Sequence, residues 1–225
     1  MFFYFALPLT LIIFFLSKAL FRRKPWPIFH PFLISMTALI ILHLVFNLDF
    51  KQYESGTKIL TYLLEPAVVA LAIPLFLQVH LIKHKLRIIL ICCFISVCIA
   101  FFVAFYILPL IGAEPIISAS LASQSITTAI AVEVTQSLDG ILSLTSIMVT
   151  FAGLLGATMG RLFLHGVGVK EKQSVGIAIG CASHVLGTAK LLEDCQEEGA
   201  FSSLALIVCA IIAALLMPFF YALLF

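Results

Sequence analysis

The stretch 88-IILICCFISVCIAFFVAFYILPLI-111 decides the fold, because it carries no charged side chain over its whole length. A helix needs about 20 consecutive apolar residues to cross the hydrocarbon core of a bilayer. Residues 201 to 225 form a second stretch of this kind. With 63% hydrophobic and 11% charged residues, the chain also lies far outside the composition of soluble domains. The sequence therefore predicts an integral membrane protein.

The fold class is predicted to be all-α. Only helices and closed barrels satisfy every backbone polar group in lipid, and the apolar stretches lack the period-2 alternation of a transmembrane barrel. We expect a polytopic helical bundle with interrupted or re-entrant helices, for which an inverted-repeat transporter fold is one form. The N-terminal apolar run has its charges after it and no A-x-A-like cleavage site, so it is interpreted as a retained first helix and not a signal peptide.

One membrane domain is predicted over residues 1–225. It is expected to comprise two spanning helices in 1–50, a first interrupted-helix unit in 59–140 and a second in 141–225. Segments 116–140 and 174–190 are expected to dip into the membrane and return to the face that they left. Spanning helices are expected at residues 1–20, 29–48, 59–81, 88–111, 141–160 and 201–225.

The distribution of Lys and Arg favours this re-entrant interpretation, because cytoplasmic loops are enriched in both. With the N-terminus outside, only Lys51 and Lys58 remain on the outer face. If both dipping segments crossed fully, the basic loop Arg161 to Gln173 would move outside and the bias would weaken. As topology signals, the basic residues imply no nucleic-acid partner. The residues expected on the cytoplasmic face are Arg22, Arg23, Lys24, Lys83, Lys85, Arg87, Arg161, Lys170, Lys172 and Lys190.

Polar side chains at membrane depth are costly and often mark a pathway. In 65-EPAVVALAIP-74, Pro66 and Pro74 each remove a backbone donor and tend to kink or break a helix. Glu65 would lie at that break and is a candidate for proton or ion coupling. The alternative is a proline-kinked helix with Glu65 near the outer interface.

The segment 123-SQSITTAIAVEV-134 is the main candidate for substrate binding. A dipping segment exposes helix-start N–H groups, and hydroxyls add the donors that a carboxylate needs. Alternatively, these hydroxyls bond back to carbonyls of their own helix. Glu133 is a second candidate for proton or cation coupling, or it pairs with a neighbouring segment. The predicted substrate-binding residues here are Ser123, Gln124, Ser125, Thr127 and Thr128.

The segment 183-SHVLGTAK-190 supplies the remaining candidates. Gly187 is expected to interrupt its helix, with His184, Thr188 and Lys190 binding substrate around it. His184 is also a candidate for proton coupling, because histidine changes charge most easily near neutral pH. Alternatively, His184 is a buried histidine satisfied by a carbonyl, and Lys190 is only the interfacial end of the segment.

Other features are predicted to be structural. The glycine spacings in 153-GLLGATMG-160 and 176-GIAIG-180 indicate close helix packing. The six cysteines have no metal-ligand spacing and are expected to be small buried apolar residues, so neither a metal nor a cofactor is predicted. The stretch 191-LLEDCQEEGA-200 is expected to be a solvated acidic turn facing the basic loop, with Glu198 the acid most expected to do more.

An enzyme is not predicted. An intramembrane hydrolase would use Ser183 or Ser202 with His184 or Lys190. However, the chain has no G-x-S-x-G elbow, and adjacent residues 183 and 184 point to different sides of a helix.

The strings EPAVVALAIPLF, SITTAIAVEV, GLLGATMG, SHVLGTAK and EGAFSSLA resemble the LrgB/CidB family of bacterial membrane proteins. The resemblance covers nearly the whole chain. It implies a plasma-membrane protein that works with a small LrgA/CidA-type membrane partner as a holin-like or antiholin-like regulator of murein hydrolases and lysis. A plant relative that fuses both parts transports glycolate and glycerate across the plastid envelope.

Together these features predict a secondary transporter of small organic anions such as glycolate, glycerate, lactate or pyruvate. The alternative is a holin-like or antiholin-like modulator, and a homo-oligomer fits either function. One departure from the family pattern bears on the anion: Ser123-Gln124 stand where a Pro-Lys pair is expected, and Ala129 replaces a proline. Either hydroxyls and helix termini bind the carboxylate here, or Lys190 does, or the substrate differs.

Overall fold

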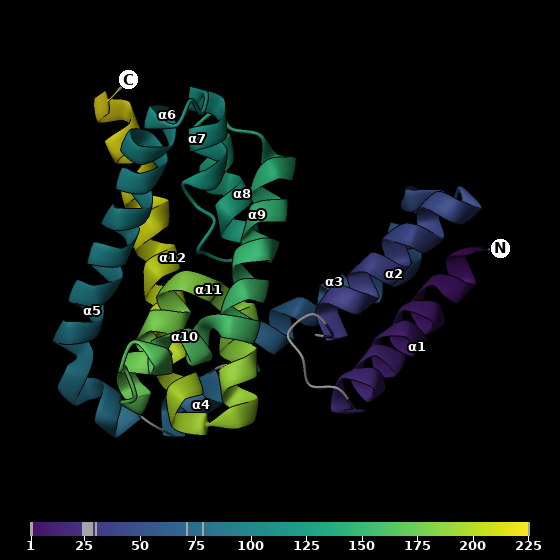
Figure 1. The fold of residues 1–225 in the computed structure, drawn as a ribbon, viewed down its shortest axis with the longest axis horizontal. Helices are drawn as coiled ribbons and strands as arrows, with labels where there is room; N and C mark the ends of the chain where they lie inside the picture. Colours follow the sequence, from purple (N-terminus) through teal and green to yellow (C-terminus); the bar gives the residue numbers. More distant parts are fainter. Residues whose placement is uncertain (1, 24–28, 30, 71, 78, 225) are drawn as a thin grey trace. The chain divides into compact units, whose positions relative to one another are not determined.

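The computed structural model describes residues 2–23, 29, 31–70, 72–77 and 79–224 (Figure 1). All regular elements within these ranges are helical, and five helices are long and apolar enough to cross a membrane. The protein is therefore an all-α, multi-pass membrane protein, as predicted. The chain forms two compact units, Met1–Ala70 and Leu71–Phe225, which are described separately.

The first unit contains α1 (Phe2–Arg23), α2 (Pro31–Phe46) and α3 (Phe50–Ala70), and α1 packs against the other two. A hydrogen bond of 2.9 Å between Thr10 Oγ1 and the Tyr53 hydroxyl joins α1 to α3.

Two expectations for this unit are wrong. Helix α3 begins nine residues before the expected residue 59, so Lys51 and Lys58 are helical and not in a loop. It also continues through Pro66 to Ala70, so Glu65 lies within a helix and not at its break, which agrees with the alternative of a helix that runs through the proline.

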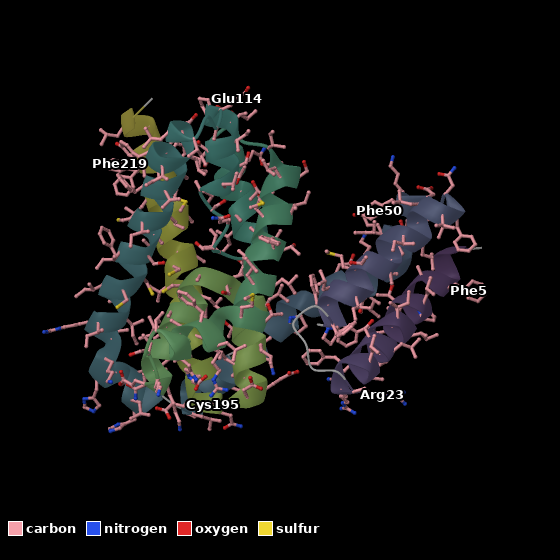
Figure 2. All side chains as sticks on the ribbon, viewed as in Figure 1. Phe5, Arg23, Phe50, Glu114, Cys195 and Phe219 are labelled. Carbon is pink, nitrogen blue, oxygen red and sulfur yellow. The ribbon has the colours of Figure 1, made fainter. Side chains whose placement is uncertain are left out.

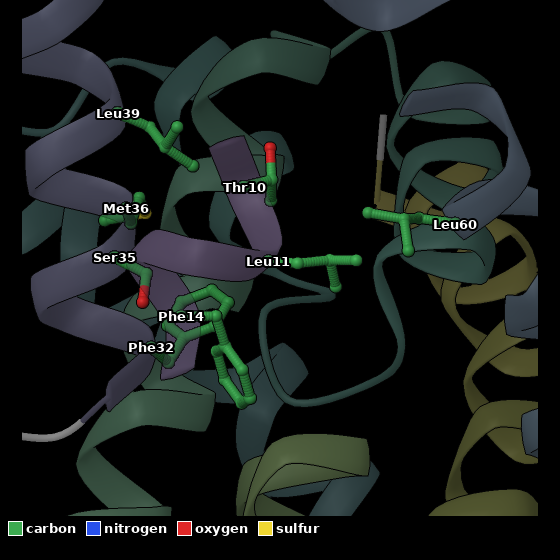
Figure 3. Close-up of a pocket in the computed structure, with 8 residues that line it drawn as sticks. All are labelled: Thr10, Leu11, Phe14, Phe32, Ser35, Met36, Leu39 and Leu60. Carbon is green, nitrogen blue, oxygen red and sulfur yellow. The ribbon is translucent and has the colours of Figure 1, made fainter. Parts of the chain in front are cut away.

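The first unit also holds a pocket of about 400 Å³ (Figure 3). Its lining is apolar apart from two hydroxyls, and each of these donates to a carbonyl one helical turn earlier, Thr10 to Ala6 and Ser35 to Pro31. With its hydroxyl donors already used, this pocket is poorly suited to an anion. The residues that line it are Thr10, Leu11, Phe14, Phe32, Ser35, Met36, Leu39 and Leu60.

The second unit repeats one pattern twice: a long helix that contains a π-helical turn is followed by a helical hairpin. Single π-helical turns, in which the backbone hydrogen bond joins residues five apart, are often found at functional sites. The first copy comprises α5 (Val79–Phe102), η2 (Val103–Ile107), α6 (Leu108–Leu110), α7 (Pro115–Leu121) and α8 (Thr128–Ser137). The second comprises α9 (Leu142–Leu155), η3 (Gly156–Gly160), α10 (Arg161–Gly166) and α11 (Lys172–Asp194). Helices α4 (Ala72–Leu77) and α12 (Gln196–Leu224) complete the unit.

The first hairpin consists of α7 and α8, which run antiparallel. Ser123, just after α7, donates to the Ala131 carbonyl of α8 at 3.1 Å. Ser120 of α7 accepts at its hydroxyl from the Ile141 backbone N–H, beyond the end of α8, at 2.7 Å. At about 1.5 Å per residue, the seven residues of α7 reach only about 10 Å into the bundle. Residues 115–137 therefore enter and return, as the charge distribution predicts.

The second hairpin is α11, which folds back at His184, where φ is 42° and ψ is −139°. A straight helix of 23 residues would be about 34 Å long. Instead, Lys172 at its start lies 3.4 Å from Glu197, three residues beyond its end. Helix α11 is thus a hairpin, as the re-entrant prediction requires, although its 23 residues are among the five stretches long and apolar enough to cross a membrane. The position of the break is different, because it occurs at His184 and not at Gly187.

The two hairpins enter the second unit from opposite ends. Glu114, which precedes the first hairpin, and Cys195, which follows the second, lie at opposite ends of this unit in Figure 2. This is the arrangement of an inverted repeat. Helix α12 packs against α4, α5, α8 and α11 and contributes Phe201 and Met217 to the core.

Three boundaries differ from expectation because charged residues extend the helices. Helix α5 begins at Val79 and includes Lys83, Lys85 and Arg87. Arg161 begins α10 and is not in a loop, and α12 begins at Gln196, so the acidic stretch is mostly helical. Such ends extend beyond the hydrocarbon core, where charge costs little.

Candidate functional site

The turn between α7 and α8 places the start of α8 at the tip of the first hairpin, where Thr127 is partly buried and Thr128 and Ala129 are exposed. Thr127 precedes α8 with extended backbone and makes no side-chain cap. The first helical bond runs from the Ala131 N–H to the Thr127 carbonyl, at 2.8 Å. The N–H groups of residues 128–130 are therefore free of helical bonds, and with the helix dipole they favour an anion.

Hydroxyl and amide groups surround this helix start. The side chains of Gln124, Ser125 and Thr127 are partly buried and that of Thr128 is exposed. None of the four has a side-chain hydrogen bond to another described residue. These groups thus offer donors to a ligand, in addition to the free N–H groups.

Ser123 has a different position from its neighbours. It is fully buried and bonds to the Thr135 hydroxyl at 3.0 Å as well as to the Ala131 carbonyl. The Thr145 hydroxyl of α9 lies 2.8 Å from the Ser120 carbonyl and 3.0 Å from the Thr135 hydroxyl, and its one proton serves these two acceptors. This network holds the first hairpin against α9. Sequence reasoning missed Ser120, Thr135 and Thr145, because their polarity alone does not distinguish them from other hydroxyl residues.

His184 forms the tip of the second hairpin. Its side chain is 5% exposed, and Nε2 lies 2.8 Å from the Val149 carbonyl of α9. The positive φ places a non-glycine residue in a region that glycine favours, and such strain often accompanies functional positions. Gly153 faces the ring closely, and a Cβ there would overlap Nε2.

Helix α9 brings the two hairpins together. Thr145 contacts the first hairpin and Val149 contacts the tip of the second, one helical turn further along, about 6 Å. Helix α7 runs in the same direction as α9 (Figure 1), so its tip lies beyond Ser120, at about the depth of Val149. No hydrogen bond between Gln124–Thr128 and His184 occurs in the structure as described.

Ser183 and Thr188 hold the second hairpin in place. The Ser183 hydroxyl packs against Gly156 at the start of η3, where a side chain would overlap it. Thr188 donates to the His184 carbonyl at 2.8 Å and shares a bond of 2.7 Å with the Ser202 hydroxyl of α12. The close packing predicted for the glycine pairs is confirmed, because Gly156 and Gly160 face α11 while Gly176 and Gly180 face α12.

The other candidates lie apart from the tips. Lys190 pairs with Asp194 at 2.7 Å and lies 4.0 Å from Glu193, near the end of α11. The Glu133 side chain is exposed on α8. The side chain of Glu65 lies outside the described residues.

A cluster of charges closes the end of the unit at which the second hairpin enters. Arg161 pairs with Glu198 at 2.9 Å and with Asp194 at 3.8 Å, and Lys172 pairs with Glu197. The acidic stretch thus faces the basic residues as predicted, and Glu198, at 2% exposed, is the acid that does more than cover the surface.

Comparison with known proteins identifies the family. The model of the LrgB-like family matches residues 10–223. The chain belongs to the LrgB family. This LrgB family member is 35% identical over 210 residues to the "Holin-like protein CidB" of Staphylococcus epidermidis, covering 93% of this chain and 92% of that one.

Two further relatives cover as much of the chain. The "Antiholin-like protein LrgB" of Bacillus cereus is 33% identical over 218 residues, 96% of this LrgB family member and 95% of the relative. An uncharacterized protein of Haemophilus influenzae is 33% identical over 217 residues, 96% and 94% of the two chains. No solved structure matches the chain.

Proposed function

We propose that this LrgB family member is a secondary transporter of small organic carboxylates of the glycolate, glycerate, lactate or pyruvate type. The observation that carries this proposal is the uncapped start of α8 at the tip of a re-entrant hairpin. Interrupted helices whose N-termini point at an anion are a recurring design of transporter substrate sites.

A carboxylate at this tip would accept hydrogen bonds from the N–H groups of residues 128–130. The hydroxyls of Ser125, Thr127 and Thr128 have no other side-chain partner among the described residues and would complete the site. A hydroxyl or keto group on the substrate would meet Gln124. This set supplies donors without a lysine, so the absence of the Pro-Lys pair is compatible with binding.

Alternating access would use the two hairpins as gates from opposite ends. His184 is the candidate for proton coupling, because it is buried at the tip of the second hairpin. It contacts Val149 on α9, one helical turn from Thr145, which contacts the first hairpin. Glu133 and Glu65 are further candidates for ion coupling. The Arg161–Glu198 pair would hold together the segments that precede and follow the second hairpin.

The setting in the cell follows from the charges. Lys85, Arg161, Lys172 and Lys190 form ion pairs at the end where the second hairpin enters. Under the positive-inside rule, that end faces the cytoplasm of a bacterial plasma membrane. By the same rule Arg22 and Arg23 at the end of α1 would be cytoplasmic and the N-terminus outside, and a small LrgA/CidA-type membrane protein would be the partner.

The test is flux in proteoliposomes, with and without such a partner. Thr128→Val removes one donor from the tip and should reduce glycolate or lactate uptake at least tenfold, since a hydrogen bond to a charged group contributes about 1.5–3 kcal/mol. Ser137→Ala is the matched control, because its hydroxyl donates only to Val134 of the same helix at the far end of α8. Absence of flux for every small carboxylate tried with folded protein contradicts the proposal.

The names of two relatives, holin-like and antiholin-like, favour a second candidate function. This candidate is a modulator of murein hydrolase export and cell lysis. A modulator of this kind would release dyes of unrelated charge and size from vesicles, in an assembly-dependent manner. It would also be indifferent to Thr128→Val and His184→Ala. Selective carboxylate flux that these substitutions abolish would exclude it as the direct activity.

A further inference from the structure

Three thiols that are far apart in the sequence converge inside the second unit. Cys93 of α5, Cys181 of the first arm of α11 and Cys209 of α12 are all buried. The Cys181 sulfur lies 3.7 Å from that of Cys93 and 3.5 Å from that of Cys209, and all three sulfurs lie within 4.8 Å of one another. The expectation of separate small apolar residues did not anticipate this cluster, because spacings of this length carry no motif.

This geometry suits one soft metal ion. Three sulfurs around an ion at a metal–sulfur distance of about 2.3 Å lie about 4 Å from one another, which is close to the observed separations. No histidine or carboxylate joins the cluster within the described part of the chain. Structural Zn²⁺ almost always takes four ligands, whereas thiolate ligands also select Cu(I), which is satisfied by three.

We infer that Cys93, Cys181 and Cys209 form a binding site for a single Cu(I) ion. On binding, the three thiols release their protons to solvent and bind the ion as thiolates, because the thiolate and not the thiol is the metal ligand. Three protons leave as one Cu(I) enters, so the retention of copper should weaken as the pH falls. Zn²⁺ would lack the fourth ligand that its structural sites almost always have.

The bound ion would add a joint between α5, α11 and α12 within the core, where α11 and α12 are already linked by the Thr188–Ser202 bond. Cys181 lies three residues before His184, so the metal would fix the first arm of the second hairpin to α5 and α12. The site is independent of the proposed transport, because metal binding can be measured without any substrate.

The experiment uses two complementary triple variants of the full chain, purified under anaerobic and reducing conditions. One replaces Cys93, Cys181 and Cys209 by Ser, and the other replaces Cys92, Cys98 and Cys195 by Ser. Cu(I) is supplied with a competing chromophoric chelator. The wild type and the second variant should each retain one equivalent of copper, and the first should lose at least 90% of it.

X-ray absorption on the second variant gives a readout that does not depend on the first variant folding. Three sulfur ligands and no nitrogen or oxygen ligand are expected around the copper. No copper retained by the wild type, equal retention by both variants, or a copper shell containing nitrogen or oxygen would overturn the inference. Retention of Zn²⁺ in preference to Cu(I) would also overturn it.

Discussion

Arg161 and Glu198 form a half-buried ion pair that joins α10 to the first turn of α12: Nη2 of the arginine donates to Oε1 of the carboxylate at 2.9 Å. Glu198 is 2% exposed, whereas the arginine side chain is 38% exposed. Arg161 Nε and Glu198 Oε2 have no hydrogen-bond partner in the structure as described. The hydrogen-bonding groups of the pair are therefore only partly satisfied, yet the pair joins the helices that precede and follow the second hairpin.

Glu198→Ala should destabilise the protein measurably. Removing one partner of a fully buried pair costs about 3–5 kcal/mol, because the other charge stays buried and unpaired. Arg161 is 38% exposed and lies 3.8 Å from Asp194, so the loss should be smaller, about 1–2 kcal/mol. The measurement is chemical denaturation in mixed micelles. Glu193→Ala is the control, because that side chain is 68% exposed and should change stability by less than about 0.5 kcal/mol. Equal effects of the two substitutions would show that the half-buried pair is not formed.

If the α7–α8 hairpin and the α11 hairpin are both re-entrant, the two ends of each hairpin lie on the same face of the membrane. Single cysteines introduced at Lys170 and Glu193 should react with an impermeant maleimide from one side, and those at Glu114 and Asp139 from the other. The background replaces Cys92, Cys98 and Cys195, which lie outside the buried thiol cluster. If Lys170→Cys and Glu193→Cys were labelled from opposite sides, α11 would cross the membrane and the hairpin would be wrong.

The sequence was sufficient for the membrane class and for both hairpins, because charge placement and interrupted apolar runs obey simple rules of lipid solvation. It did not locate the break in α11, since Gly187 is the residue that local rules select and His184 is held in its conformation by α9. The Thr145 hydrogen-bond network and the cluster of three thiols could not be predicted from the sequence either. Both depend on contacts between distant helices, which periodicity and spacing do not encode.

Gly156→Ala should disturb the second hairpin, because the added methyl would overlap the Ser183 hydroxyl. Overpacking of this kind costs about 1–3 kcal/mol. Gly166→Ala is a matched control, since its Cβ would meet no atom within 4 Å. Combining Gly156→Ala with Ser183→Gly removes the overlap and should restore at least part of the lost thermal stability. If the double variant recovered none of the lost thermal stability, the destabilisation by Gly156→Ala would have a cause other than the Gly156–Ser183 overlap.

His184→Gly should be more stable than His184→Ala by about 1 kcal/mol or more, because only glycine adopts the observed positive φ without strain. Both substitutions remove the bond to Val149, so the difference isolates the backbone. Denaturation in mixed micelles measures it. Equal stability, or a more stable alanine variant, would mean that residue 184 is not held at positive φ.

The Lys85–Glu171 pair should give stability that depends on pH in the acidic range. Hydrogen bonds from the Ser174 hydroxyl and from Lys85 hold the pKa of Glu171 below its ordinary value of 4.5. A carboxyl with a depressed pKa stabilises the folded state above its unfolded pKa, and this contribution is lost as pH falls through the folded value. The thermal midpoint of the wild type should therefore exceed that of Glu171→Gln slightly at pH 7, and the gap should close below pH 4.5. Glu193→Gln provides the control for a solvated acid, and a gap for Glu171→Gln that widens on acidification would contradict the assigned sign.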